Sequence, residues 1–325
     1  MNRVILITGC AGFIGHMTAI KFLQKGHKVV GVDNINDYYS VRLKQWRLEQ
    51  IRSIGGDNFE FIEGDLSKDI LSSLDENIDF DAVIHLAAQA GVRFSLEKPE
   101  RYIDSNVVAF DKLLTWMKFR DIDKLLYASS SSVYGKMAGM PLSETINCNQ
   151  PESYYAATKI ANEMMAHASW RSHSKTSLGM RFFTVYGPAG RPDMAPIIFS
   201  LKALNSEVIK LFNFGRQQRD FTYIDDIVES IYRLYGVYSK KVKSAELINI
   251  GCGSPVSLES FVDILKDCSG KDLLTELVPE QPGDVRSTYA DTNKLERWIG
   301  FWKKTGFEKG LGLTYSWVKE NRHLL

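Results

Sequence analysis

The stretch that decides the fold of this chain is Val4-Ile5-Leu6-Ile7-Thr8-Gly9-Cys10-Ala11-Gly12-Phe13-Ile14-Gly15. Its aliphatic run, residues 4–8, predicts a buried strand. Gly9, Gly12 and Gly15 follow at a G-x-x-G-x-x-G spacing, which permits a tight turn and lets a ligand approach the backbone closely. The helix that starts there offers its N-terminus to a pyrophosphate. The stretch therefore predicts a dinucleotide-binding site, with Phe13 and Ile14 beside the ligand.

Asp33 indicates which dinucleotide is bound. It follows the next predicted strand, residues 28–32, where the adenosine ribose of a bound dinucleotide should lie. A carboxylate there accepts hydrogen bonds from the ribose hydroxyls but repels a 2′-phosphate, and Asn34 stands where a phosphate-binding arginine would be favoured. NAD is therefore the expected cofactor. Further contacts to it are expected from Asn34, Asn36, Asp65, Leu66, Leu86, Ala87 and Ala88. For Asp65 the alternative is a simple helix cap.

Short apolar segments alternate with longer helical ones through the first part of the chain. Strands are expected at residues 4–8, 28–32, 59–63, 82–86, 124–129 and 177–182. This alternation predicts an α/β fold with a doubly wound parallel sheet of the Rossmann type. After Tyr186-Gly187-Pro188 the elements become shorter and are separated by Gly, Pro and Asp clusters. We therefore expect an NAD-binding domain at residues 1–186 and a smaller substrate-binding domain mainly at 187–325, with returns to the sheet near 215–250.

Composition narrows the classes of protein and of partner. The 325 residues are 44% hydrophobic and 24% charged, as in an ordinary globular protein. A formal net charge of +1 gives no electrostatic footprint for nucleic acid or an anionic membrane. No segment approaches the ~20 apolar residues of a membrane span, and the N-terminus does not read as a targeting peptide. Four scattered cysteines lack metal-type spacing, which favours reduced thiols and a cytoplasmic protein without a metal site.

The expected chemistry lies on a helix predicted at residues 153–170. Tyr155 and Lys159 are four apart, so they share a face of that helix. Bringing a tyrosine pKa from ~10 to neutrality costs about 4 kcal/mol, and one cation at ~5 Å supplies about 3 kcal/mol. Lys159 and an oxidised nicotinamide could together make Tyr155 a base. Ser130 follows the fifth predicted strand at the ligand-binding edge of the sheet, although serines there can also simply bond the loop backbone.

Together these motifs resemble the extended short-chain dehydrogenase/reductase family over nearly the whole chain. Within that family the likeness is to enzymes that epimerise UDP-glucuronate at C4. The segments that carry it are residues 33–39 (DNINDYY), 91–97 (GVRFSLE), 181–188 (RFFTVYGP), 190–194 (GRPDM), 218–226 (QRDFTYIDD) and 281–285 (QPGDV). The resemblance implies a nucleotide-sugar 4-epimerase of polysaccharide biosynthesis, which passes through a transient 4-keto sugar.

The resemblance also implies roles for individual residues. Ser130 would be the catalytic hydroxyl, Tyr155 the base and Lys159 its partner. Asn106 and Phe183 would lie near NAD, and Thr184, Arg219 and Asp284 would meet the UDP-sugar. Two positions depart from the family pattern: Arg286 replaces a proline, and Gln281 replaces an arginine that binds diphosphate. Arg286 is therefore a candidate for that missing contact.

A glucuronate substrate adds a requirement, because its 4-keto intermediate is a β-keto acid and can lose carbon dioxide. We expect the sugar carboxylate to be held by Ser130 and Thr184 together with Arg191 or Arg93, although either arginine could instead form a surface ion pair. Competing readings are a UDP-glucose 4-epimerase, a UDP-glucuronate decarboxylase and a non-catalytic NAD-binding scaffold. A decarboxylase would be expected to carry a glutamate where this chain has Ser132, and a 4,6-dehydratase Asp-Glu at Ser131-Ser132.

Two amphipathic stretches, residues 99–119 and 153–170, lie where the family pairs helices into a four-helix dimer interface. Trp116, Phe119, Met164 and Met165 could supply apolar contacts there. Packing against the sheet explains much of the same pattern, so the homodimer is expected mainly from the resemblance.

Overall fold

A seven-stranded parallel sheet forms the centre of the computed structural model, which describes residues 3–136, 139–279 and 287–325. The strand order is β10-β6-β5-β4-β1-β2-β3, and every neighbouring pair is parallel. The strands are β1 (Val4–Thr8), β2 (Lys28–Asp33), β3 (Phe59–Glu63), β4 (Phe80–His85), β5 (Leu125–Ser130), β6 (Ser177–Phe182) and β10 (Ala245–Ile250). The order reverses beside β1, as in a doubly wound sheet. The predicted Rossmann-type fold class is confirmed.

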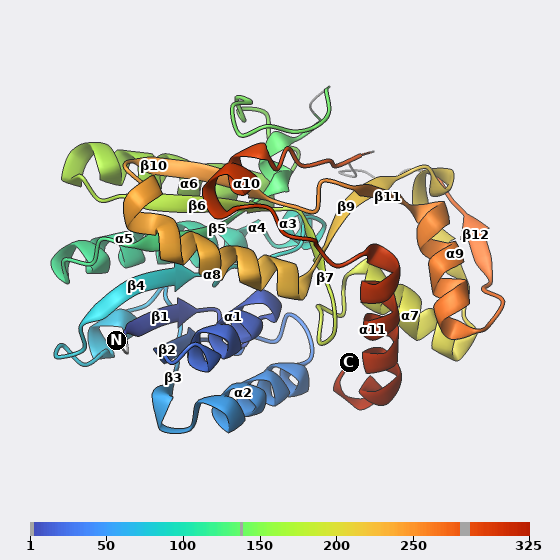
Figure 1. The fold of residues 1–325 in the computed structure, drawn as a ribbon, viewed down its shortest axis with the longest axis horizontal. Coiled ribbons are helices and arrows are strands. Elements are labelled where there is room, and N and C mark those ends of the chain that lie inside the picture. The colour runs from blue at the N-terminus through green and yellow to red at the C-terminus, as the bar shows by residue number, and fades with distance from the viewer. Residues whose placement is uncertain (1–2, 137–138, 280–286) are drawn as a thin grey trace.

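Helices cover both faces of this sheet (Figure 1). One face carries α1 (Phe13–Gln24), α2 (Val41–Gly55), α8 (Ile224–Lys241) and α10 (Asn293–Ile299). The other carries α4 (Pro99–Tyr102), α5 (Ala109–Phe119) and α6 (Tyr154–His173), with the short α3 (Phe94–Glu97) nearby. Strands buried on both faces need near-continuous apolar runs. That requirement explains why β1 and β4 are almost entirely buried.

The helix expected at residues 99–119 is not regular throughout. A π-helical segment, η3 (Ile103–Val108), separates α4 from α5. Sequence periodicity does not reveal such an inserted wide turn, which is often found at functional sites. The second expected helix begins at Tyr154, because the Ser153 hydroxyl caps it by accepting a hydrogen bond from the backbone N–H of Ala156.

A smaller group of elements lies beside the ends of the central strands (right in Figure 1). It contains a three-stranded sheet of β7 (Thr184–Tyr186), β9 (Gln218–Tyr223) and β11 (Pro255–Ser257), and a pair formed by β8 (Ile209–Leu211) and β12 (Thr275–Leu277). Its helices are α7 (Ala195–Asn205), α9 (Leu258–Ser269) and α11 (Phe307–Glu320), and they share one hydrophobic core. Between these elements the chain returns to the central layer, where α8 packs on α1 and β10 extends the sheet beside β6.

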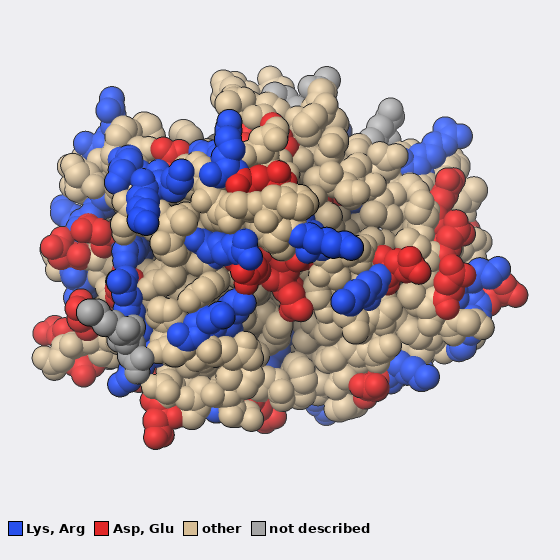
Figure 2. Space-filling model, viewed as in Figure 1, with Lys and Arg blue, Asp and Glu red and all other residues tan. Residues whose placement is uncertain are grey.

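A cavity of about 960 Å³ is lined both by the carboxyl ends of the central strands and by the smaller group of elements. This edge of a doubly wound sheet is where ligands bind. On the face shown in Figure 2, basic and acidic side chains are interspersed rather than gathered by sign. Within the described ranges, no helix combines the length and apolar character needed to cross a bilayer.

Candidate active site

The glycine turn after β1 forms one wall of the cavity. Gly9 has a φ of +71°, and a Cβ added to it would lie 2.6 Å from the backbone nitrogen of Ala87. The turn therefore needs glycine both for its conformation and for its close approach to the segment after β4. Gly12 precedes α1, whose first turn contains no acidic residue, so the helix N-terminus faces the cavity without a competing carboxylate.

Asp33 at the end of β2 is fixed by the backbone around it. One carboxylate oxygen accepts from Ala11 N at 3.0 Å and the other from Ile35 N at 2.9 Å. Burial raises the pKa of Asp33, while the bond from Ile35 and the charge of Lys44 oppose that rise. The carboxylate lines the cavity with both oxygens anchored, as a receptor for two ribose hydroxyls requires.

Lys44 on α2 is a cavity-lining residue that the sequence analysis missed. Its ammonium donates to the backbone oxygen of Asn36 at 2.6 Å and to the side-chain oxygen at 2.8 Å. Burial lowers the pKa of Lys44 to about 8, and the nearby Asp33 carboxylate opposes that fall. The sequence gives little indication that Lys44 lines a cavity, because an isolated lysine on an amphipathic helix normally lies on its solvated face.

Every other residue expected to contact the cofactor, except Asn106, lines this same cavity. Asp65 does so while also capping its own turn, since it accepts from both the backbone and the hydroxyl of Ser67 and from the amide of Asn34. The cavity-lining set is Gly9, Gly12, Phe13, Ile14, Gly15, Asp33, Asn34, Asn36, Asp65, Leu66, Leu86, Ala87, Ala88, Tyr155, Lys159 and Phe183.

Asn106 lies behind the cavity wall in the π-helical segment. Its side chain accepts from Gln89 N at 2.8 Å and donates to Gln89 O at 3.1 Å, and it also donates to the hydroxyl of Thr158. Asn106 thus ties the segment after β4, which lines the cavity, to α6, which carries Tyr155 and Lys159. Its contact with the cavity is indirect.

Ser130, Tyr155 and Lys159 meet at the base of the cavity. Ser130 lines the cavity together with Tyr155, and its hydroxyl oxygen accepts from Ser132 N at 3.1 Å, so it also caps the following turn, η4 (Ser131–Tyr134). The Lys159 ammonium donates to the backbone oxygen of Ala128 at 2.8 Å. The three side chains come from β5 and α6, two elements that pack directly against each other.

Burial has the largest effect on the pKa values of Tyr155 and Lys159. It raises the pKa of Tyr155, against the hydrogen bond from Ser130 and the positive charge of Arg191. It lowers the pKa of Lys159 to about 8, while the charge of Glu163 acts in the opposite direction. Tyr155 is therefore a phenol in this form of the protein. A further positive charge close to the ring is required to make it a base near neutral pH.

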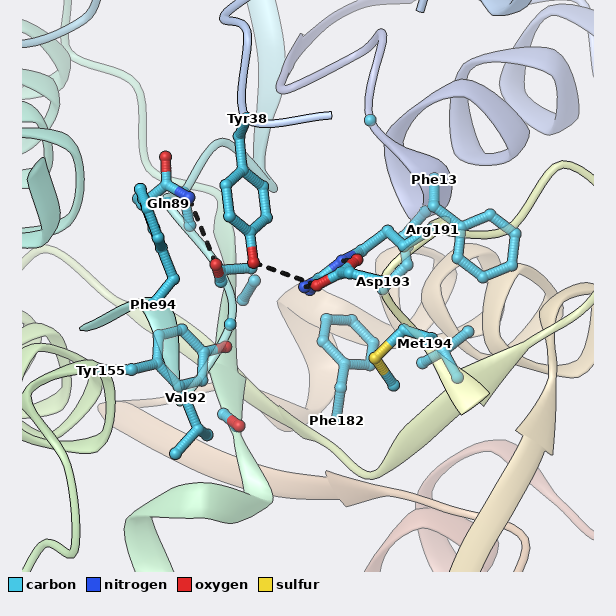
Figure 3. Close-up of a pocket in the computed structure, with 18 of the residues that line it drawn as sticks. Phe13, Tyr38, Gln89, Val92, Phe94, Tyr155, Phe182, Arg191, Asp193 and Met194 are labelled. Carbon is cyan, nitrogen blue, oxygen red and sulfur yellow. Dashed lines mark hydrogen bonds and ion pairs between the residues drawn. The ribbon is translucent and has the colours of Figure 1, made fainter. Parts of the chain in front are cut away.

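Opposite Tyr155, Arg191 and Asp193 form an ion pair that reaches across to Tyr38 (Figure 3). Arg191 Nε donates to Asp193 at 3.0 Å, and the Tyr38 hydroxyl donates to the same carboxylate at 3.0 Å. Tyr38 and Asp193 are 155 positions apart, so their pairing was not visible in the sequence. The ion pair anticipated as the alternative role of Arg191 does exist, but it lies inside the cavity wall.

The remaining expected substrate contacts divide into two groups. Arg93, Thr184 and Arg219 line the cavity, and the Arg93 guanidinium lies 5.3 Å from the ring centre of Phe212, so it bridges to the smaller group of elements. Asp284, Arg286 and Gln281 lie outside the residues that the structure describes. In the described ranges, no group of three or more His, Cys, Asp or Glu side chains could hold a metal ion.

Comparison with known proteins gives consistent results along the whole chain. The model of the NAD dependent epimerase/dehydratase family matches residues 5–251. The chain is 44% identical to protein CapI of Staphylococcus aureus, over 97% of this chain and 98% of that protein. It is 39% identical to a UDP-glucuronate 4-epimerase of Thermodesulfobacterium geofontis, over 98% and 97%. The crystal structure of UDP-glucuronic acid 4-epimerase from Bacillus cereus with UDP-glucuronic acid and NAD superimposes with a TM-score of 0.91 at 32% identity, covering 98% of this chain and 99% of that one.

Proposed function

The chain belongs to the NAD-dependent epimerase/dehydratase family and is a nucleotide-sugar epimerase that uses NAD, and from that premise we propose that it converts UDP-glucuronate to UDP-galacturonate by inverting C4. The observation that carries the proposal is the composition of one cavity. Ser130, Tyr155 and Lys159 lie on one side of it, with Thr184 and Arg191 also in its wall. The serine, tyrosine and lysine suit the oxidation of a carbinol. The threonine and arginine suit the binding of a sugar that bears a carboxylate.

Tyr155 is the proposed base, with Ser130 and Lys159 as the other catalytic residues. Bound NAD would supply the hydride acceptor for oxidation at C4 and the hydride donor for reduction of the ketone from its opposite face. Tyr155 takes the proton of the C4 hydroxyl and gives it back, while Ser130 holds the C4 oxygen by a hydrogen bond. The glycine turn at residues 9–15 would take the cofactor pyrophosphate and Asp33 the adenosine ribose.

The proposed grip on the sugar carboxylate comes from short hydroxyl side chains and an arginine. Ser130, Ser131, Ser132 and Thr184 all line the cavity, as does Arg191. When the carboxylate is held, the carbon–carbon bond that joins it to the sugar cannot align with the π system of the C4 carbonyl. Decarboxylation of the β-keto acid is thereby suppressed. The turn after β5 offers only serines at positions 131 and 132, where a competing decarboxylase or dehydratase would place acids.

We expect purified protein to convert UDP-glucuronate to UDP-galacturonate without added NAD, because the cofactor is regenerated at each turnover. The measurement is proton NMR of the sugar, with UDP-glucose supplied in a parallel reaction. Faster conversion of UDP-glucose would identify a neutral-sugar epimerase, and accumulation of UDP-xylose a decarboxylase. No conversion of any UDP-sugar by NAD-loaded protein would contradict the proposal.

The proposed assembly is a homodimer through α5, α6 and the segment before α5. Phe119 is 81% exposed and Met164 is 58% exposed on these helices, so they carry apolar surface that the sheet does not cover. Trp116 and Met165 are half-buried against the core of the same layer, so they contribute less than the sequence pattern predicted.

Met164→Glu should therefore convert a dimer to a monomer without loss of NAD, because it places a charge in the proposed apolar interface. Light scattering after gel filtration measures the mass. Phe301→Glu is the matched control, since Phe301 is equally apolar and 78% exposed but lies outside these helices. A parent protein that is monomeric at micromolar concentration would refute the homodimer.

The proposed location is the cytoplasm, where NAD and UDP-sugars are available to an enzyme. All four cysteines are free, as is usual in a reducing compartment. A product such as UDP-galacturonate would supply polysaccharide biosynthesis.

A further inference from the structure

A buried ion pair lies directly behind the proposed catalytic residues. Arg181 of β6 donates to Glu163 of α6 through two parallel bonds, Nε to Oε1 at 2.8 Å and Nη2 to Oε2 at 2.7 Å. The two side chains are only 3% and 2% exposed, and neither lines the cavity. The function proposed above leaves this pair without a role.

The pair is joined to the strand end that carries the chemistry. The Ser129 hydroxyl donates to Glu163 Oε1 at 2.5 Å, and Ser129 is the register partner of Arg181 in the sheet. Ser129 stands between Ala128, whose carbonyl accepts from Lys159, and Ser130, which lines the cavity with Tyr155 and lowers the pKa of its hydroxyl. A single carboxylate therefore fixes the backbone segment that carries Ser130 and that also accepts the hydrogen bond from Lys159.

The same pair also reaches the far end of the serine turn. The Arg181 guanidinium lies 4.8 Å from the ring centre of Tyr134, the last residue of η4, and the Tyr134 hydroxyl donates to Asn249 at 2.6 Å. Ser131 and Ser132, which line the cavity, are thus held between Ser129 at one end and Tyr134 at the other.

Glu163 is also the acidic side chain that follows Lys159 one helical turn further on, at the i+4 position. Lys159 lies near His85 on β4, while the ionisable groups around its helix neighbours Glu163 and Tyr155 are Tyr127 on β5, Arg181 on β6, Tyr102 on α4 and Arg191 from the opposite wall. His85 is buried, and its pKa is lowered to about 3 by burial and by the charge of Lys159, so it is neutral. Among the described residues, Glu163 is the charged side chain that raises the pKa of Lys159 and so supports its ammonium form.

Stability alone is a poor explanation for such a pair. Burying two charges costs several kcal/mol of desolvation, and apolar side chains of similar size often do as well or better. The buried Arg181 Nη1 also lacks a hydrogen-bond partner within the described part of the chain. A pair that is costly to bury and tied to the reacting segment is better explained by a role in the reaction.

We infer that Glu163 is a positioning residue, which holds the Ser129–Ser130 strand end in place through hydrogen bonds and places a buried negative charge one helical turn from Lys159. The inference rests on Tyr155, Lys159 and Ser130 acting as proposed above, but not on which UDP-sugar is the substrate.

Glu163→Gln tests the charge, because it keeps the shape and removes the negative charge. A lysine needed as a cation loses its role as the pH rises through its pKa, and removal of a nearby negative charge lowers that pKa. We therefore expect the alkaline limb of the kcat–pH profile to move to lower pH by about one unit. A purely structural residue would change the amount of folded enzyme without moving this limb.

Two variants separate geometry from charge. Glu163→Asp keeps the charge but is too short to hold Ser129 and Arg181 together, so kcat should fall between about ten- and a hundredfold while the alkaline limb stays in place. Ser129→Ala should lower kcat in the same sense, again without moving the limb. If Glu163→Gln folds poorly, the double variant Glu163→Gln/Arg181→Met removes both charges. It should fold and still show the limb at lower pH than the parent.

A second measurement does not depend on turnover. Acetic anhydride labels neutral amines, so the pH dependence of Lys159 labelling in the NAD-loaded protein, read by peptide mass spectrometry, follows its ionisation. Labelling should begin at lower pH in Glu163→Gln than in the parent, with exposed Lys28 as internal reference. If the parent converts no UDP-sugar, the proposed function fails and this labelling still decides the role of Glu163. Coincident labelling curves, or coincident normalised pH profiles for the Gln, Asp and parent enzymes, would overturn the inference.

Discussion

Replacing Tyr155 by phenylalanine should give a folded protein that still binds NAD but epimerises its UDP-sugar ~10²–10⁴-fold more slowly than the parent. The ring of Tyr155 is half-buried in the cavity wall and packs edge-on against Tyr102, with ring centres 6.2 Å apart. Phenylalanine preserves that packing. Only the oxygen that we propose takes and returns the C4 proton is lost.

The size of the effect follows from the proton that Tyr155 has to accept. Burial raises its pKa, so the protein without cofactor holds it as a phenol. The hydrogen bond from Ser130 and the charge of Arg191 lower the pKa, and the positive nicotinamide ring of bound NAD adds to both. If Tyr155 acts as a phenolate, as proposed, kcat/KM of the parent should rise with pH through the Tyr155 pKa. The phenylalanine variant should lack that limb.

Tyr154→Phe is the matched control for this experiment. Tyr154 precedes Tyr155 on α6, is 53% exposed and does not line the cavity, so it loses the same atom from the same helix. Its activity should equal that of the parent. Turnover is followed by NMR, and bound NAD is measured by absorbance after the protein is denatured. A Tyr155→Phe enzyme that keeps more than about a tenth of the parent kcat would exclude Tyr155 as the base.

The features that could be predicted from the sequence are those that lie close together along the chain. Gly9, Gly12 and Gly15 are fixed within one turn, and Tyr155 and Lys159 within two turns of one helix, so local geometry alone brings each set together. The strands at residues 4–8 and 177–182 were predicted at their observed bounds, and both are inner strands that are almost entirely buried. Residues 59–63 were also predicted at their observed bounds, although they form a partly exposed strand at the edge of the sheet.

The features that could not be predicted depend on contacts between distant segments. Tyr38 meets Asp193 only because the loop after β2 and the segment after β7 lie on opposite walls of one cavity. Asn106 acts through Gln89 because a π-helical segment turns its side chain behind the wall, and a wide helical turn leaves no signature in the residue pattern. Glu163 is an acid on an amphipathic helix in the sequence, and only the sheet register places Ser129 and Arg181 on either side of it.

Gly15→Ala should weaken the binding of NAD strongly, because it alters the glycine turn. Gly15 lies in the first turn of α1, and a Cβ there would overlap the backbone carbonyl of Gly9. Two backbone segments meet at this point, so no side chain can move aside to make room. Relief requires a shift of the turn between Gly9 and Gly12, on which the cofactor pyrophosphate is expected to sit.

Forced overpacking of a buried contact costs ~1–3 kcal/mol. Because the overpacking distorts the surface that would bind the cofactor, this free-energy cost reduces NAD affinity by up to about a hundredfold. Isothermal titration with NAD measures the affinity, and circular dichroism checks that the fold is retained. Gly236→Ala is the matched control: Gly236 is exposed in α8, an added Cβ meets nothing within 4 Å, and alanine should stabilise that helix by ~0.5–1 kcal/mol without changing NAD affinity. If Gly15→Ala binds NAD as tightly as Gly236→Ala does, the glycine turn is not the pyrophosphate site, and the cofactor orientation that places the nicotinamide beside Tyr155 loses its main support.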